Sequence, residues 1–328
     1  MVGKYNIVTT EEVKELESLS VGIIQNYLEQ LDITNKQTLA NYKQGAQMFF
    51  KYLNEEQIES VSRQTIKDYK KWLKCHYDQN KLRMVKYKAT SMNTYMAELK
   101  TFFNYLETLG VPNYAKDLKR ERVNTSRHLR DNLTLEQVKT IFSSIDTTTE
   151  QGARENAIFR LMVGTGIREC EVVAAKIEDI RPHGSKIVLE VQGKGYQSIE
   201  NNKSDLVELT PSVLKAINYY LSFRQGAKPS EPLFCSVNNS NMGKSLTTRT
   251  LRNIVKGLYV RNGIISDRIT THSLRHTAIT LALSNGASLI KAKEMARHTN
   301  INTTMIYAHD LNRFVDNAEG VLETALNS

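Results

Sequence analysis

The sequence predicts a mainly α-helical protein with a small β-sheet, in which a helical N-terminal domain precedes a mixed α/β domain. Three observations support this fold class. Apolar residues recur at helical spacing through the first 110 residues. The second half contains a pair of strand-like segments among further helices, and a polar, basic stretch separates the halves. A chain of 328 residues is long enough for two domains with a core each.

The N-terminal domain is expected to span residues 1–115. Four amphipathic helices are predicted there, with apolar positions running from Leu16 to Leu31, from Leu39 to Leu53, from Ile66 to Leu73 and from Tyr95 to Leu106. No segment in this region has the pattern of a strand. Four short helices of this kind form a compact bundle.

Basic residues in this domain occur in two runs. Lys67 to Trp72 interleaves lysines with Tyr69 and Trp72, and we expect these aromatic side chains to face the core while the lysines are solvated. The second run lies between two predicted helices, where cations can follow a phosphate backbone. Its candidate DNA-binding residues are Lys81, Arg83, Lys86 and Lys88.

Residues 116–131 are predicted to form a basic interdomain linker, because this stretch is polar and short of apolar residues. Lys119, Arg120 and Arg122 are its candidate DNA contacts, since clustered cations repel one another unless a polyanion neutralises them. The whole chain carries a net charge of +9, which is compatible with a polyanionic partner but does not by itself identify one.

The second domain, residues 132–328, begins with the capping box Thr134 to Gln137, which predicts the start of a helix. A later helix runs into the turn Gly164-Thr-Gly166. Segments 186–191 and 206–209 are predicted to pair as strands, which places Gly193-Lys194-Gly195 where the chain leaves the first strand. From Leu311 to Leu326 the apolar residues form one stripe, typical of an amphipathic terminal helix.

Several classes of protein do not fit the sequence. Cys75, Cys170 and Cys235 lie far apart without metal-type spacing, so we expect reduced thiols and an intracellular protein. There is no apolar run long enough to span a membrane and no apolar signal core, which predicts a cytoplasmic location. No glycine-rich nucleotide loop is present either, and we expect no cofactor and no metal.

Residue types suited to phosphodiester chemistry gather between Thr271 and Tyr307. Arginine grips phosphate bidentately, imidazoles move protons near neutrality, and a phenol can attack phosphorus. The segment contains His272, Arg275, His276, His298 and Tyr307, and Arg168 and Glu171 follow the glycine turn upstream.

This pattern resembles the tyrosine recombinase family, also called the phage integrase family. That family combines a Thr-Gly-x-Arg-x-x-Glu box, a lysine on a β-hairpin, a His-x-x-Arg-His box and a Gly-His pair with a tyrosine nine residues later. The same spacing separates His298 from Tyr307, and the main departure is Arg297 in place of glycine. The resemblance covers about Leu133 to Tyr307, and more loosely the N-terminal half, which implies an N-terminal core-binding domain and a tyrosine-recombinase catalytic domain.

The resemblance implies a role for each residue of the constellation. Arg168 and Arg275 would hold the non-bridging oxygens of the scissile phosphate, and Tyr307 would attack the phosphorus. His272 would accept the tyrosine proton and His298 would hydrogen-bond the phosphate.

The leaving 5′ oxygen would receive a proton from Lys194, with Lys203 as the alternative because residues 196–202 separate Lys194 from the second strand. Glu171 and His276 would support the arginines and the local fold, and His309 would be structural.

The implied partner is double-stranded DNA with paired half-sites, bound by a tetramer that the terminal helix organises by docking on a neighbouring protomer. Packing of that helix on its own domain is the competing interpretation. Two other functions stay open: DNA relaxation like that of a type IB topoisomerase, which uses the same intermediate, and an inactive relative that binds DNA. The sequence does not reveal the DNA target, the accessory proteins, or whether the outcome is integration, excision, inversion or dimer resolution.

Overall fold

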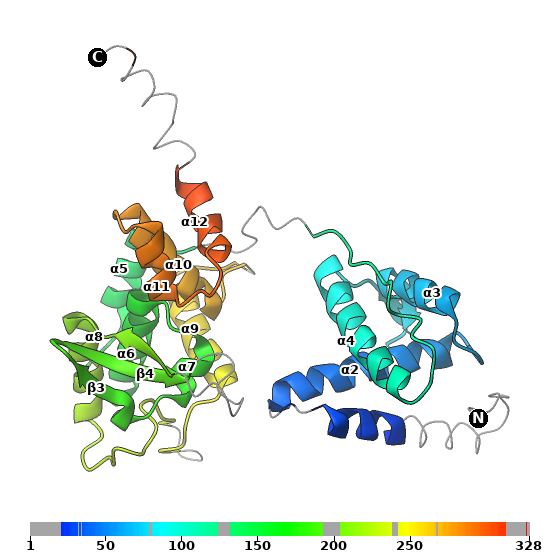
Figure 1. Ribbon diagram of the computed structural model, residues 1–328. Coiled ribbons are helices and arrows are strands. Elements are labelled where there is room, and N and C mark those ends of the chain that lie inside the picture. The colour runs from blue at the N-terminus through cyan, green and yellow to red at the C-terminus, as the bar shows by residue number, and fades with distance from the viewer. Residues whose placement is uncertain are drawn as a thin grey trace. The chain divides into compact units, whose positions relative to one another are not determined.

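The computed structural model describes residues 21–31, 33, 35–78, 81–123, 132–192, 204–237, 242–266, 268–312 and 326, and for 308–312 the backbone alone. The chain divides into two compact units, residues 1–124 and residues 125–328 (Figure 1). Across the described residues helices predominate and the strands form small antiparallel sheets. The predicted fold class is therefore confirmed.

The N-terminal unit is built from helices at the predicted places. Residues 21–30 are helical, and α2 (Lys36–Glu55), α3 (Arg63–Lys74) and α4 (Ala89–Thr108) follow. Side-chain caps fix two of the starts: the Asn35 carboxamide accepts hydrogen bonds from two backbone N–H groups of α2, and Ser62 begins α3 with a capping box. Leu16 and Leu19 lie outside the described residues.

Aromatic side chains make the core of this unit. Tyr27, Phe49, Tyr69 and Phe102 are almost completely buried, and their rings meet neighbouring rings edge-on. Trp72 is also buried, which confirms that the aromatics of the 67–72 run face the core. The lysines of that run lie toward the surface, where Lys70 forms a salt bridge with Glu121.

A β-hairpin lies between α3 and α4, so the prediction of a strand-free N-terminal region was wrong. Strand β1 (His76–Asp78) pairs antiparallel with β2 (Arg83–Val85). Three residues are too few to show the alternation by which a strand is predicted. The buried Asp78 carboxylate secures the hairpin by accepting hydrogen bonds from Lys51 Nζ at 2.8 Å and from the Lys81 backbone N–H at 3.1 Å.

The chain after α4 packs back on the same unit. Lys70 Nζ donates to the Lys119 carbonyl at 2.9 Å, and the Asn93 carboxamide bonds both backbone groups of Glu121. The first part of the stretch predicted as a linker, residues 116–123, is thus held by side chains of α3 and α4, while residues 124–131 lie outside the described residues.

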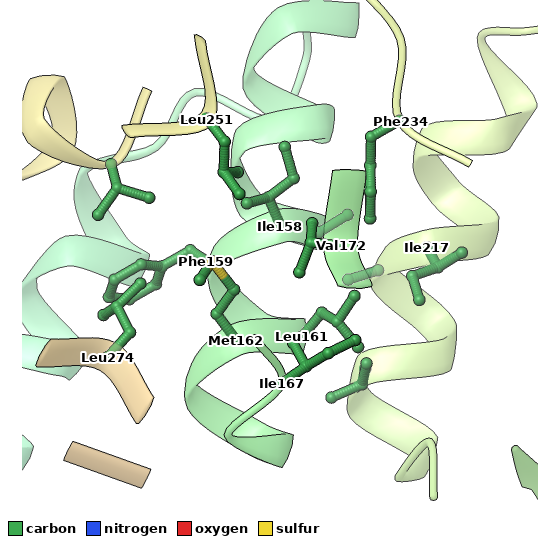
Figure 2. Close-up of a cluster of buried hydrophobic side chains, with 14 of the residues drawn as sticks. Ile158, Phe159, Leu161, Met162, Ile167, Val172, Ile217, Phe234, Leu251 and Leu274 are labelled. Carbon is green, nitrogen blue, oxygen red and sulfur yellow. The ribbon is translucent and has the colours of Figure 1, made fainter. Parts of the chain in front are cut away.

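The second unit is organised around helix α6 (Glu150–Thr165), which is buried on nearly every side. The other helices are α5 (Leu135–Ser144), α7 (Glu169–Ala174), η1 (Ile177–Asp179), α8 (Pro211–Ser222), α9 (Thr248–Arg261), α10 (Thr271–Ser284), α11 (Leu289–Ala296) and α12 (Asn302–Asn312). Figure 2 shows Phe159 and Leu161 of α6 among side chains of α7, α8, α9 and α10. A helix buried all round is a core helix, and it fixes the positions of the helices that carry the site.

The sheet of this unit has the order β3 (Ile180–His183), β4 (Lys186–Gln192), β5 (Ser204–Glu208), all antiparallel. The predicted pairing of β4 with β5 is confirmed, and so is the capping box at Thr134. Strand β3 was not predicted because Arg181, Pro182 and His183 give it an exposed, polar character. In the part of the chain that the structure describes, no helix is both long and apolar enough to cross a membrane.

Candidate active site

The turn after α6 positions the first candidate residue. Gly166 caps α6 in the left-handed region at φ 64°, a conformation that glycine adopts without strain. An added Cβ would lie 3.5 Å from Ala278 and 3.8 Å from the Arg275 Cγ, so α10 also packs closely here. The turn ends α6 and directs the chain into α7, where Arg168 is the residue that precedes the first turn.

Arg168 is held by a buried carboxylate on the next turn. Its backbone N–H donates to Glu171 Oε2 at 2.8 Å, and its Nη1 donates to Oε1 at 2.7 Å. The Glu171 side chain is 1% exposed, whereas that of Arg168 is 27% exposed. The carboxylate therefore anchors the arginine from inside the domain, and the guanidinium keeps a face open to solvent.

Helix α10 supplies three candidate residues on one face. His272, Arg275 and His276 are three and four residues apart, so their side chains lie on the same side of the helix. Arg275 is buried, and its guanidinium donates to the carbonyls of Gly166, at 2.6 Å, and of Ala296. The His272 and His276 rings meet edge-on with centroids 4.7 Å apart.

Positive charge is concentrated at this point. Burial first, and then the charges of the neighbouring Arg168 and Arg297, lower the pKa of Arg275 to about 10. The guanidinium is still protonated at neutral pH, because pH 7 lies far below that value. Burial likewise lowers the pKa of Arg297, although the Glu171 carboxylate opposes this. A cluster of desolvated cations is prepared to bind an anion.

Tyr307 lies on α12 with 4% of its surface exposed. Its ring packs in an apolar cluster with Ile279, Ala292 and Ala296 from α10 and α11. Its hydroxyl is hydrogen-bonded to Nδ1 of His276. Helices α10, α11 and α12 are in mutual contact and lie together in Figure 1, and this packing brings the phenol to the α10 histidines.

His298 follows the end of α11. Its Nδ1 lies 2.9 Å from the hydroxyl of Thr304, which is fully buried, and its ring centroid is 6.5 Å from that of Tyr307. Burial lowers the pKa of His298 to about 4, and the charges of Arg275 and Arg168 contribute in the same direction. The imidazole is therefore neutral at pH 7 in the DNA-free protein.

Arg297 is the residue at which the sequence departs from the family pattern. It ends α11 in the left-handed region at φ 52° and ψ 46°. Its carbonyl accepts a hydrogen bond from Arg168 Nη2 at 3.2 Å, and its own guanidinium donates to Glu171.

The structure brings most of the candidate residues together, namely Arg168, Glu171, His272, Arg275, His276, His298 and Tyr307. Lys194, Lys203 and the side chain of His309 lie outside the described residues. The seven candidate DNA contacts belong to the other unit and are all exposed: Lys81, Arg83, Lys86, Lys88, Lys119, Arg120 and Arg122.

Sequence reasoning missed three contacts at this site. It gave His276 a supporting role without placing it at the Tyr307 hydroxyl, and it named neither Thr304 nor a side-chain role for Arg297. The spacing of four residues from His272 to His276 on a helix was the available signal for the first. Nothing local marks Thr304, which becomes relevant only when α12 packs beside His298.

Known protein families match both halves of the chain. Residues 131–313 match the Phage integrase family, and residues 24–110 match the Phage integrase, N-terminal SAM-like domain. Tyrosine recombinase XerD of Listeria monocytogenes is 32% identical over 225 residues, which cover 67% of this chain and 72% of that protein. Tyrosine recombinase XerD of Lacticaseibacillus casei is 28% identical over 293 residues, or 88% and 94%. The chain therefore belongs to the phage integrase family and is a tyrosine-type site-specific DNA recombinase.

Solved structures show the same fold. A XerH site-specific recombinase bound to palindromic difH substrate, in a post-cleavage complex, has a TM-score of 0.68 at 19% identity, covering 93% of this chain and 89% of that chain. The Tn1549 transposon integrase in complex with transposon right end DNA has a TM-score of 0.62 at 16% identity, covering 93% and 98%.

Proposed function

We propose that this recombinase cuts and rejoins DNA one strand at a time through a 3′-phosphotyrosine intermediate formed on Tyr307. The observation that carries the proposal is the hydrogen bond between the Tyr307 hydroxyl and His276, within the charge field of Arg275. A phenol titrates near pH 10, and neighbouring imidazoles together with fixed cations are what allow it to attack near neutrality.

Each step exchanges one phosphodiester linkage for another. The Tyr307 oxygen forms a bond to phosphorus, the bond from phosphorus to the 5′ oxygen breaks, and the 3′ end remains on the enzyme. Arg168 and Arg275 bind the two non-bridging oxygens and stabilise the charge of the pentacoordinate state. A 5′ hydroxyl from a partner strand then attacks the phosphotyrosine and releases Tyr307, so no external energy source enters.

Proton transfer involves the two α10 histidines and a lysine. His272 accepts the phenol proton in the DNA-bound enzyme, and His276 orients the hydroxyl before attack. His298 donates a hydrogen bond to the scissile phosphate. Lys194 protonates the leaving 5′ oxygen, with Lys203 as the alternative donor.

Double-stranded DNA with paired half-sites is the substrate. The helical and catalytic domains close around it as a clamp, and the exposed cations of the N-terminal unit contribute contacts to the phosphate backbone. The 311–326 stripe docks on a neighbouring protomer and organises a tetramer. The biological outcome is integration or excision of a mobile element, or resolution of DNA dimers, in the cytoplasm.

Replacing the nucleophile tests the chemistry. A duplex is first selected from a randomised pool by its binding to the protein, and a nick beside the cleavage position then traps any covalent complex. We expect Tyr307→Phe to bind this site with unchanged affinity and to form no covalent complex. Tyr259→Phe is the matched control, because Tyr259 is equally buried and its hydroxyl donates to the Thr270 carbonyl in the same unit. A covalent complex on Tyr307→Phe in a denaturing gel would overturn the assignment.

A further inference from the structure

Arg297 occupies a backbone conformation that usually favours glycine. It caps α11 at φ 52° and ψ 46°, and the N–H groups of Arg297 and His298 close the turn on the carbonyls of Glu294 and Lys293. Left-handed backbone is uncommon for a residue with a Cβ, and its cost falls on the folded state. Position 297 therefore carries its side chain at a backbone cost that glycine would avoid.

The Arg297 side chain is turned into the site and is 8% exposed. Its Nη2 donates to Glu171 Oε2, the same oxygen that accepts the Arg168 backbone N–H. Among the described residues, its Nε–H is buried without an acceptor at hydrogen-bond distance, since the Asp205 carboxylate lies 3.6 Å away. The guanidinium therefore pairs by a hydrogen bond with Glu171, and its Nε also lies at ion-pair distance from Asp205 on β5.

The charges of this cluster show what the contact does. Glu171 is 1% exposed and carries one negative charge between two guanidinium groups. If Arg168 were its sole cationic partner, the carboxylate would cancel much of the positive field that Arg168 offers to a phosphate. Because Arg297 pairs with Oε2, its positive charge offsets the negative charge of the carboxylate on the buried side. The positive charge of Arg168 therefore remains available on the exposed side.

We propose that Arg297 is a positioning residue for Arg168: it balances and orients Glu171, so that Arg168 presents an uncompensated guanidinium to the scissile phosphate. The inference rests on the proposed cleavage chemistry. Arg297 also holds Arg168 from the other end, because its carbonyl accepts from Arg168 Nη2 at 3.2 Å. That second contact uses the backbone alone, so a substitution at position 297 separates the two effects.

The test is Arg297→Gly, which removes the guanidinium, keeps the carbonyl and relieves the left-handed backbone. Covalent-complex formation is measured in single turnover on the nicked selected site, with either a phosphodiester or a methylphosphonate at the scissile position. A methylphosphonate carries no charge before attack, so it has less need of the Arg168 charge. We expect Arg297→Gly to slow cleavage of the phosphodiester by about 10- to 100-fold with unchanged binding. The deficit on the methylphosphonate should shrink to within about threefold.

Two further variants make the result specific. Combined with Arg168→Ala, Arg297→Gly should cause no additional loss, because a residue that acts through another is silent once that partner is absent. Arg261→Ala is the control, since it removes an arginine from another buried carboxylate, Glu155, on α6. It should affect both substrates equally.

The outcomes separate the inference from the proposed function. Equal loss for Arg297→Gly on both substrates would reduce Arg297 to a structural role, and no loss on either would show that its guanidinium is dispensable. If Arg297→Gly unfolds, Arg297→Lys is tested in its place, because it keeps the charge but lacks the planar fork. A larger loss on the phosphodiester than on the methylphosphonate would support the inference, and an equal loss would contradict it. Absence of a covalent complex in the unaltered protein would instead count against the proposed function itself.

Discussion

Replacing Glu171 with alanine removes the single carboxylate that two guanidinium groups share. The side chain is 1% exposed and accepts from the Arg168 backbone N–H at 2.8 Å, from Arg168 Nη1 at 2.7 Å and from Arg297 Nη2. In Glu171→Ala these donors lose their acceptor and the two cations repel each other across a small cavity. The protein should therefore be less stable.

The size of the effect follows from the burial of the partners. Leaving an uncompensated buried charge costs about 3–5 kcal/mol. Arg297 is 8% exposed and, among the described residues, keeps only the half-exposed Asp205 at 3.6 Å as a partner, whereas Arg168 is 27% exposed and water screens part of its charge. We therefore expect a loss of about 3 kcal/mol, the low end of that range. For a unit the size of residues 125–328, this lowers Tm by about 6–12 °C.

Differential scanning calorimetry of the full chain measures this change. Glu169→Ala is the matched control, because Glu169 lies on the same short helix and pairs with Arg252 at 2.7 Å, while the Arg252 side chain is 62% exposed. An exposed pair of that kind contributes about 0–1 kcal/mol. If the two variants melted within about 2 °C of each other, the description of Glu171 as a buried structural charge would be refuted.

Three other predictions concern pH, DNA contacts and assembly. Burial holds the folded pKa of His298 at about 4, below its ordinary value, so the unfolded chain takes up the proton first as pH falls. Stability is therefore lost between about pH 6.5 and 4. His298→Asn should flatten the fall in Tm from pH 7 to 5, and an unchanged dependence of Tm on pH would contradict this. Replacing Lys81, Arg83, Lys86 and Lys88 with glutamine should reduce the log–log salt dependence of DNA affinity by about 0.9 for each phosphate that these four side chains neutralise; an unchanged slope would place these residues away from the backbone. Removing residues 312–328 should spare half-site binding and lower cooperative occupancy of a full site, whereas unchanged cooperativity with a lower Tm would favour packing of the helix on its own domain.

The sequence predicted the helices and the main strand pair because their signals are local. Thr134 is a capping residue whose side chain bonds the first turn of its helix, and the apolar, β-branched run of β4 predicts a strand without knowledge of its partner. The β1–β2 hairpin was not predictable in this way. Its strands are three residues long, and Asp78 is secured by Lys51 from a different helix.

The candidate site was predictable as a set of residues but not as a set of contacts. Spacing identified Tyr307 and Arg275 as candidates, since their order along the chain follows the family pattern. It could not show that the Tyr307 hydroxyl meets His276 rather than solvent, because that contact depends on how α12 packs against α10. For the same reason Arg297 was identified as a departure at a glycine position, and its contact with Glu171 emerged only from the fold.

The two arginines that we propose bind the scissile phosphate are also structural groups, which would fix their geometry before DNA binds. Arg275 donates to Gly166 and Ala296, the carbonyls at the ends of α6 and α11, and Arg168 donates to the Arg297 carbonyl. These carbonyls lie at helix C-termini, where backbone acceptors lack intrahelical partners and the helix dipole attracts cations. A guanidinium has five N–H donors in one plane, so two can hold helix ends while the others remain for a phosphate. A lysine has a single ammonium group, which cannot bond the helix-end carbonyls and bind a phosphate at the same time. Arg275→Lys should therefore lose helix-end contacts and phosphate geometry together.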